Sequence, residues 1–309
     1  MSLPTTATGS RRLVDAVPPH AFFAVSAVFH YLGPSFAVLL FASIAPLGVA
    51  WLRIAIAALL LAAWAKPWRM LGRLAAAERR LVLALGVVLA AMNCVFYLAI
   101  AQLPLATVGA IEFIGPIVLA VLGTRSSRNA IALVLTVAGL LCLVQLRIPQ
   151  EPAAFGFALA NAALFALYVV IGHRLASTGQ RTSPGERLAC AMAVAAVAGL
   201  PFGLIDALPA LRDPWLLAAA AGVAVSSSVV PYLCDQVAMR RLPRASFSLF
   251  LAILPAVAVL IGYFVLGQRL TAFEGIGVLL VVAGVALHRP AFAPADEHHH
   301  DRRGGQHDD

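Results

Sequence analysis

The sequence predicts an all-α polytopic membrane protein whose ten transmembrane helices form two inverted five-helix repeats. Three observations predict this fold class: an apolar composition, ten long apolar runs, and prolines that recur at a constant offset. Of the 309 residues, 61% are hydrophobic and only 12% are charged, and the mean hydropathy is +0.91. Because soluble domains carry about 25% charged residues, this composition excludes an ordinary soluble fold.

Ten apolar runs bounded by Pro, Gly or Arg define the expected spans. Each run approaches the roughly 20 residues that a helix needs to cross a bilayer, and none shows the alternating ten-residue pattern of a membrane barrel. The first five runs are 19–41, 44–65, 81–101, 104–123 and 129–146, and the last five are 153–175, 185–205, 214–239, 242–266 and 270–288. The expected division is a cytoplasmic N-terminal segment 1–18, repeats 19–146 and 153–288, and a disordered cytoplasmic tail 289–309.

Prolines at matching positions indicate that the two halves are copies. Pro104 and Pro243, which open the fourth and ninth runs, lie 139 residues apart. Pro116 and Pro255, in the middles of those runs, have the same offset. The recurrence therefore predicts two equivalent helices that are each interrupted by a proline.

The match between the halves extends to Gly139 and Gly284 when six residues are inserted in the second copy. Because each copy holds five spans, an odd number, the second copy enters the membrane in the opposite sense. Inverted repeats with interrupted helices are typical of secondary transporters, whose substrate site lies near the membrane midplane between the repeats.

The positions of the basic residues predict the orientation. With the N-terminus in the cytoplasm, 18 of the 22 Lys and Arg residues fall on the inner side, three fall outside, and Arg53 lies within a span. Cytoplasmic loops carry the excess of Lys and Arg in membrane proteins. We therefore expect both termini in the cytoplasm, with the first apolar run retained in a bacterial inner membrane.

Four ionisable residues lie within the expected spans: His30, Arg53, Glu112 and Asp235. Each costs at least about 2.5 to 3.5 kcal/mol at bilayer depth, so each calls for an explanation. Glu112 is either a carboxylate that binds and releases a proton during transport, or one half of a packing ion pair with Arg53. Arg53 is either that counter-ion or an anchor for a substrate carboxylate. His30 is either a proton-sensitive ligand or a neutral packing residue.

Prolines also mark candidate helix breaks near these polar residues. A proline removes the hydrogen bond to the carbonyl four residues earlier, so Pro116 frees the carbonyl of Glu112 and Pro34 frees that of His30. Pro231 frees the carbonyl of Ser227, within three consecutive serines. Those serines are either substrate contacts or polar links between helices.

Polar side chains spaced by one helical turn indicate a shared interior cavity. The pairs are Asn93 with Tyr97, Tyr232 with Gln236 and, seven residues apart, Asn161 with Tyr168. Subtracting 139 places Tyr232 on Asn93 and Gln236 on Tyr97, so equivalent helices direct polar groups at one interior. Asn161 and Tyr168 either line the same cavity or bridge helices.

No enzyme, metal or nucleic-acid motif competes with transport. The chain has no GxSxG, Walker or HExxH motif, and its four cysteines stand singly within apolar runs. The histidines of the tail are more simply read as part of a solvated segment than as a metal site. We therefore expect no enzymatic activity, no cofactor and no nucleic-acid partner.

The chain resembles the EamA-type drug/metabolite transporters, and within them the threonine/homoserine exporters. The stretches that carry the resemblance are Leu52-Arg53, Lys66-Pro67-Trp68-Arg69, Met92-Asn93, Phe96-Tyr97-Leu98, Glu112-Phe113, Gly115-Pro116 and Pro231-Tyr232. The resemblance implies ten helices in two inverted repeats, and export of small amino acids in exchange for protons. The chain departs from that pattern at Leu254 and Gln268, where the family often has Glu, and it keeps an eighth-span carboxylate as Asp235.

The resulting hypothesis is a proton-coupled exporter of a small zwitterion. In this hypothesis Arg53 and Tyr97 hold polar groups of the cargo, and Glu112 exchanges a proton for it. Two alternatives stay open: an exporter of nucleosides, drugs or other metabolites, and a membrane-embedded assembly subunit whose polar interior only specifies helix packing.

Overall fold

The computed structural model describes residues 18–72, 74–114, 126–143, 152–177, 184–242, 253–267 and 271–287, together with Phe247 and Leu251. In these ranges the regular structure is helical, as predicted. Six helical segments are long and apolar enough to cross a membrane. They are α2 (Pro19–Leu40), α3 (Pro46–Ala65), α5 (Ala76–Ile100), α9 (Pro152–Ser177), α10 (Pro184–Arg212) and the continuous run α11 (Pro214–Ala224), η1 (Val225–Val229) and α12 (Val230–Arg241).

Five shorter helices complete the described chain. They are α4 (Pro67–Leu71), α6 (Leu105–Glu112), α8 (Ser127–Leu143), α14 (Leu254–Leu266) and α15 (Ala272–Leu287). Of these, α8, α14 and α15 contain apolar stretches too short to count as full spans by themselves. The α4 helix, which follows Lys66, has no counterpart among the predicted runs.

Local residue chemistry sets several helix ends. Proline occupies the first turn of α2, α3, α11 and α14, where its missing N–H has no intrahelical partner to lose. Asp213 caps α11 by accepting hydrogen bonds from the backbone N–H groups of Trp215, at 2.8 Å, and Leu216, at 3.4 Å. At the other end, Lys66 after α3 and Gly267 after α14 adopt left-handed conformations that stop the helix.

The distribution of polar residues is that of a membrane protein. Large apolar side chains such as Ile205, 78% exposed, and Leu279, 70% exposed, cover the outside. In water such a surface would be unstable, whereas in a bilayer it faces lipid. Polar and ionisable side chains are instead buried among the helices: Arg53, Asn93, Glu112, Asn161, Asp235 and Gln236.

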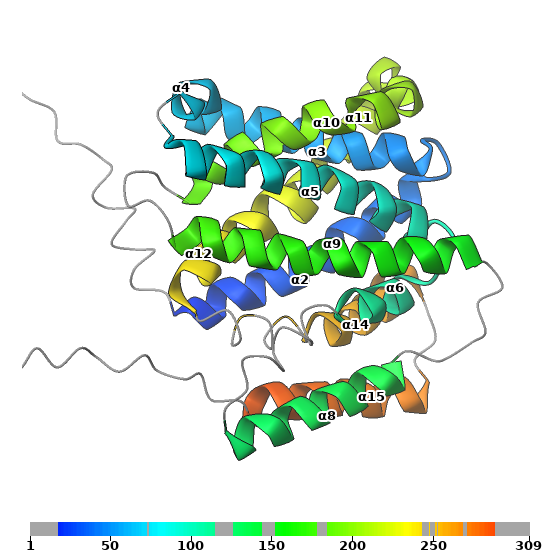
Figure 1. Cartoon of the computed structure of the whole chain (residues 1–309). Coiled ribbons are helices and arrows are strands. Elements are labelled where there is room, and N and C mark those ends of the chain that lie inside the picture. The colour runs from blue at the N-terminus through cyan, green and yellow to red at the C-terminus, as the bar shows by residue number, and fades with distance from the viewer. Residues whose placement is uncertain are drawn as a thin grey trace, which may run out of the picture.

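The helices pack in two groups that differ in size (Figure 1). The larger group contains α3 on α10, α5 on both α9 and α10, and α2 on α12. The smaller group is the pair α8 and α15, which lies at the edge of the larger group next to α6 and α14.

Two glycines allow α8 and α15 to approach each other closely. A Cβ added at Gly139 would overlap the backbone of Gly277 and the side chain of Val281. A Cβ added at Gly284 would overlap Thr136 and the backbone of Ala132. An offset of 145 converts the first set of contacts into the second, so the two helices meet through a reciprocal interface.

Two helices are interrupted next to the recurring prolines. The α6 helix ends at Glu112 and is followed by a turn at Phe113, before Pro116, which lies outside the described residues. The α14 helix begins at Leu254, directly after a turn at Ile253, so Pro255 occupies its first turn. Pro255, expected to mark a break in the middle of the ninth run, thus lies in the first turn of a helix, where a proline loses no hydrogen bond.

The other two prolines behave differently from each other. Pro34 lies inside α2, which continues to Leu40, so this proline removes one hydrogen bond without breaking the helix. Pro231 follows the π-helical turn η1, which contains the three serines. The eighth span is therefore irregular next to Pro231, the proline from which a break was expected. π-helical turns of this kind recur at functional sites.

Candidate transport site

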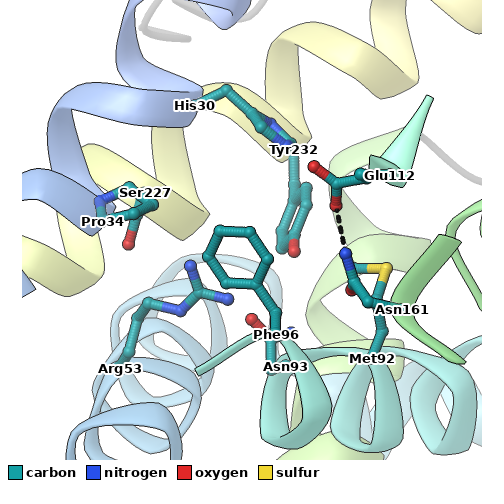
Figure 2. Close-up of a pocket in the computed structure, with 10 residues that line it drawn as sticks. All are labelled: His30, Pro34, Arg53, Met92, Asn93, Phe96, Glu112, Asn161, Ser227 and Tyr232. Atoms are coloured by element: carbon teal, nitrogen blue, oxygen red, sulfur yellow. Dashed lines mark hydrogen bonds between the residues drawn. The ribbon is translucent and has the colours of Figure 1, made fainter. Parts of the chain in front are cut away.

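A small pocket lies where the polar residues of the larger group converge (Figure 2). Seven helical elements contribute to it: α2, α3, α5, α6, α9, η1 and α12. Its lining residues are His30, Pro34, Arg53, Met92, Asn93, Phe96, Glu112, Asn161, Ser227 and Tyr232. Helices from both halves of the chain thus surround one polar space.

Glu112 stands at the broken end of α6 and is 2% exposed. The amide of Asn161 donates to Glu112 Oε1 at 2.9 Å, and the hydroxyl of Tyr31 donates to Glu112 Oε2 at 3.2 Å. Gly109 makes the second contact possible, because a Cβ at that position would lie 2.7 Å from the Tyr31 hydroxyl. Each carboxylate oxygen therefore has one neutral donor.

Arg53 enters the pocket from α3 and is 4% exposed. Its guanidinium carbon lies 4.9 Å from the centre of the Tyr97 ring, a cation–π distance. Its Nε is buried, and no acceptor among the described residues bonds to it. A buried guanidinium with a free N–H is ready to bind an acceptor that enters the pocket.

Arg53 and Glu112 are not paired with each other. Within the described chain no hydrogen bond or ion pair joins them, and Figure 2 shows them reaching the pocket from different sides. The packing ion pair considered from the sequence is therefore not what this conformation contains. The pocket instead presents a cationic group and an anionic group separately.

His30 and the aromatic residues form another part of the wall. The His30 ring lies 5.6 Å from that of Tyr31, 6.0 Å from that of Phe165 and 6.5 Å from that of Tyr232. Its Nδ1 is buried, with no hydrogen-bond partner among the described residues.

The remaining predicted residues divide between two places. Asn93 and Tyr232 line the pocket, whereas Tyr97 supports Arg53 from below its guanidinium. Asn93 also donates to the carbonyl of Leu89 at 2.7 Å. Asn161, which the sequence left between lining and bridging, lines the pocket, and its Oδ1 is buried without a partner in the described chain.

Asp235 belongs to a second cluster, which we call the Asp235 cluster: Ser26, Tyr168 and Asp235. The Ser26 hydroxyl lies 2.5 Å from Asp235 Oδ1, and the Tyr168 hydroxyl lies 3.4 Å from Asp235 Oδ2. Asp235 does not line the pocket, but it follows Tyr232, a lining residue, by three positions on α12. The Tyr168 and Tyr232 rings are 5.7 Å apart and connect the two sites.

Sequence reasoning did not select Ser26 or Tyr31 as site residues. A signal for Ser26 was present, because Ser26, His30 and Pro34 recur every four residues and so share one face of α2. Tyr31 had no such signal, because its role depends on the approach of α6 at Gly109.

The fold and its buried polar pocket are those of an all-helical membrane protein, and comparisons with known proteins give its class as a transporter. The EamA-like transporter family matches residues 153–288. The chain is 33% identical to the threonine/homoserine exporter RhtA of Salmonella typhimurium LT2 over 254 residues, which cover 81% of this chain and 84% of that protein. It is 31% identical to RhtA of Escherichia coli K12 over 278 residues, 89% of this chain and 92% of that protein.

The chain belongs to the EamA-like transporter family. A solved crystal structure of a protein that is 17% identical superposes on it with a TM-score of 0.62, and the match covers 87% of this chain and 96% of that one. At this identity the likeness concerns the fold alone.

Proposed function

We propose that this protein exports small amino acids, of the size and polarity of threonine or homoserine, from a bacterial cytoplasm in exchange for protons. The observation that carries the proposal is the separation of Arg53 from Glu112 in one buried pocket. An amino acid carries both a carboxylate and an ammonium group. It therefore satisfies both ends of a pocket whose own charges are unpaired.

The chemistry of the lining gives each end of the cargo a partner. The guanidinium of Arg53 bonds the carboxylate of the cargo, a geometry for which Arg is well suited. The carboxylate of Glu112 and the Oδ1 of Asn161 accept hydrogen bonds from the ammonium group. Ser227 and Asn93 are positioned on the wall for a short polar side chain such as a hydroxyl.

We also propose that the two halves are inverted five-helix repeats, with ten spans and both termini in the cytoplasm. The reciprocal contacts of Gly139 and Gly284 support the repeat, since helices related by a two-fold axis meet in this way. The pairing of α3 with α10 and of α8 with α15 supports it as well, because these are equivalent helices in the two halves. The bias of 18 inner to three outer basic residues supports the orientation.

Alternating access follows from this arrangement. A site between two repeats opens to one side and then the other when the repeats move against each other. Cargo and proton drive export when each favours a different state of the protein. The names of the relatives, threonine/homoserine exporters, agree with a small amino acid as cargo.

Counterflow in proteoliposomes tests the proposal. Vesicles that contain the purified full chain and unlabelled threonine are expected to take up labelled threonine transiently, and homoserine is expected to replace it. Uptake of a labelled nucleoside or drug, with none of any amino acid, would contradict the proposed cargo. Absence of counterflow for every compound in the panel would support an assembly subunit instead.

A further inference from the structure

We propose that Asp235 is the proton site of the exchange and is separate from the cargo site, which contains Glu112. This inference rests on the proposed function and divides its two ligands between the two buried carboxylates. The contacts around the two carboxylates differ in kind, and that difference supports the assignment.

Among the described residues, the side-chain donors to Asp235 are hydroxyl groups only. Ser26 Oγ lies 2.5 Å from Asp235 Oδ1 and 3.3 Å from the carbonyl oxygen of Pro231, and the Tyr168 hydroxyl reaches Oδ2. Asp235 is 1% exposed, and no cation among the described residues forms an ion pair with it. A hydroxyl group can both donate and accept a hydrogen bond. Its O–H can therefore reorient when the carboxyl group of Asp235 gains or loses a proton.

Proton counting shows that this cluster accommodates both states of Asp235. When Asp235 is ionised, the Ser26 hydroxyl donates its single hydrogen bond to Oδ1, and the carbonyl oxygen of Pro231 accepts none from Ser26. When Oδ1 carries a proton, the carboxyl group donates to Ser26 Oγ, and the Ser26 proton turns to the carbonyl of Pro231. The bound proton is taken up from the outer solution and released to the cytoplasm, so no other reactant is needed.

Around Glu112 the arrangement is different. The amide nitrogen of Asn161, which can only donate, occupies Oε1. The Tyr31 hydroxyl donates to Oε2 but, unlike that of Ser26, has no second acceptor among the described residues. Arg53 supplies a cation to the same pocket. Glu112 also lines the space that the cargo fills, whereas Asp235 does not. Glu112 is thus placed to meet the ammonium group of the cargo, and Asp235 is placed to hold a proton that the cargo does not touch.

The other titratable and charged groups near α12 have different contacts. Among the described elements, α2, α9, α10 and η1 pack most closely against α12, and η1 contributes only serine hydroxyls. Of the groups on α2, His30 faces the pocket and Tyr31 bonds Glu112. The remaining titratable or charged residues on these helices whose side chains the structure describes are Tyr168, His173, Arg174, Glu186, Arg187, Cys190, Asp206 and Arg212. Tyr168 alone among them has a hydrogen bond to Asp235.

The α2 helix connects the proton site to the cargo site. It carries Ser26 to Asp235, and it carries His30 and Pro34 to the pocket one and two turns further on. The packing of α2 on η1 is tight at this point, because a Cβ added at Gly33 would overlap Ser227, another lining residue. A change in the Ser26–Asp235 contact therefore moves a helix that forms the pocket wall, which couples the proton to the cargo.

Two transport measurements on the full chain in proteoliposomes test the assignment. One is counterflow of labelled threonine at equal pH on both sides, and the other is threonine accumulation driven by an acidic interior. For one proton exchanged, each pH unit sustains about a tenfold cargo gradient. For Asp235→Asn we expect counterflow within about twofold of the wild type and no accumulation, whereas Glu112→Gln loses both and the control Asp206→Asn keeps both.

Ser26→Ala provides a second test, because it removes the relay and leaves the carboxyl group in place. We expect accumulation to fall several-fold while counterflow is retained. Accumulation at the wild-type level by Asp235→Asn overturns the assignment, as does loss of counterflow by a folded Asp235→Asn protein, which would place Asp235 in the cargo site. If Asp235→Asn does not fold, wild-type accumulation by Ser26→Ala overturns it. A wild-type protein without amino-acid counterflow instead refutes the proposed function, and the proton site with it.

Discussion

Arg53 and Glu112 line one buried pocket from different helices, and no hydrogen bond or ion pair of the described chain joins them. Opposite charges in a buried site usually pair, since each unpaired charge is costly there. Arg53 is instead supported by the face of Tyr97, and Glu112 by the neutral donors Tyr31 and Asn161. Each charge is therefore held in place without the other, and a zwitterion can join them.

Replacing Arg53 by Gln should weaken recognition of the cargo carboxylate. Hydrogen bonds to charged groups contribute about 1.5 to 3 kcal/mol, so we expect threonine affinity to fall roughly 10- to 100-fold. Threoninol, which lacks the carboxylate, should bind the variant and the wild type about equally. Competition against labelled threonine measures both affinities.

The control for Arg53→Gln is Arg212→Gln, at the exposed end of α10. It removes the same group without touching the pocket, and it should leave both affinities unchanged. An equal loss of threonine and threoninol binding in Arg53→Gln would show that Arg53 supports the pocket and does not bind the carboxylate.

Removing the Tyr31 hydroxyl should loosen Glu112. Tyr31→Phe deletes one of the two donors, at a cost of about 0.5 to 1.5 kcal/mol, so we expect a roughly 2- to 10-fold increase in the KM for threonine. Gly109→Ala should act in the same direction, because its methyl group displaces the Tyr31 hydroxyl. Initial rates of uptake in proteoliposomes measure KM, and Tyr263→Phe, on an exposed tyrosine, is the control.

The sequence predicted the helical class and several pocket residues because these depend on local patterns. Long apolar runs define spans whatever their neighbours are, and a buried ionisable residue is conspicuous in them. Asn93 and Tyr232 were found through one-turn spacing and the 139-residue offset, and both line the pocket.

The pairing of side chains across helices could not be predicted in this way. The partnership of Ser26 with Asp235 joins residues 209 positions apart, and it depends on how α2 crosses α12. The same holds for Tyr31, whose contact with Glu112 depends on the absence of a side chain at Gly109. The loss of a backbone N–H identified Pro34 and Pro255 as irregular positions. It did not show that Pro34 lies inside a continuous helix, whereas Pro255 lies at the start of one.

Gly33→Ala should destabilise the protein by overpacking the crossing of α2 and η1. The added methyl group would overlap the backbone and Cβ of Ser227, so one helix must move. Overpacking of this kind costs about 1 to 3 kcal/mol. We expect a lower Tm in detergent and slower threonine counterflow.

Gly222→Ala is the matched control, since this glycine lies in α11, in the helical run that contains Ser227, with no atom near its added Cβ. It should leave Tm unchanged or raise it slightly, because alanine favours helix more than glycine does. A wild-type Tm for Gly33→Ala would mean that the helices separate there without cost.

The reciprocal contacts of α8 and α15 give a test of the repeat symmetry. Gly139 packs against Gly277 and Val281, and Gly284 packs against Ala132 and Thr136. Because the two environments are equivalent, Gly139→Ala and Gly284→Ala should lower Tm by similar amounts, each costing about 1 to 3 kcal/mol. The double variant should lose less than the sum, since the first substitution already separates the helices that the second would push apart.

Gly275→Ala, on α15 with open space at its Cβ, is the control and should keep the wild-type Tm. Clearly unequal effects of the two single substitutions, measured by thermal unfolding of the purified protein, would contradict a two-fold relation between the halves at this interface.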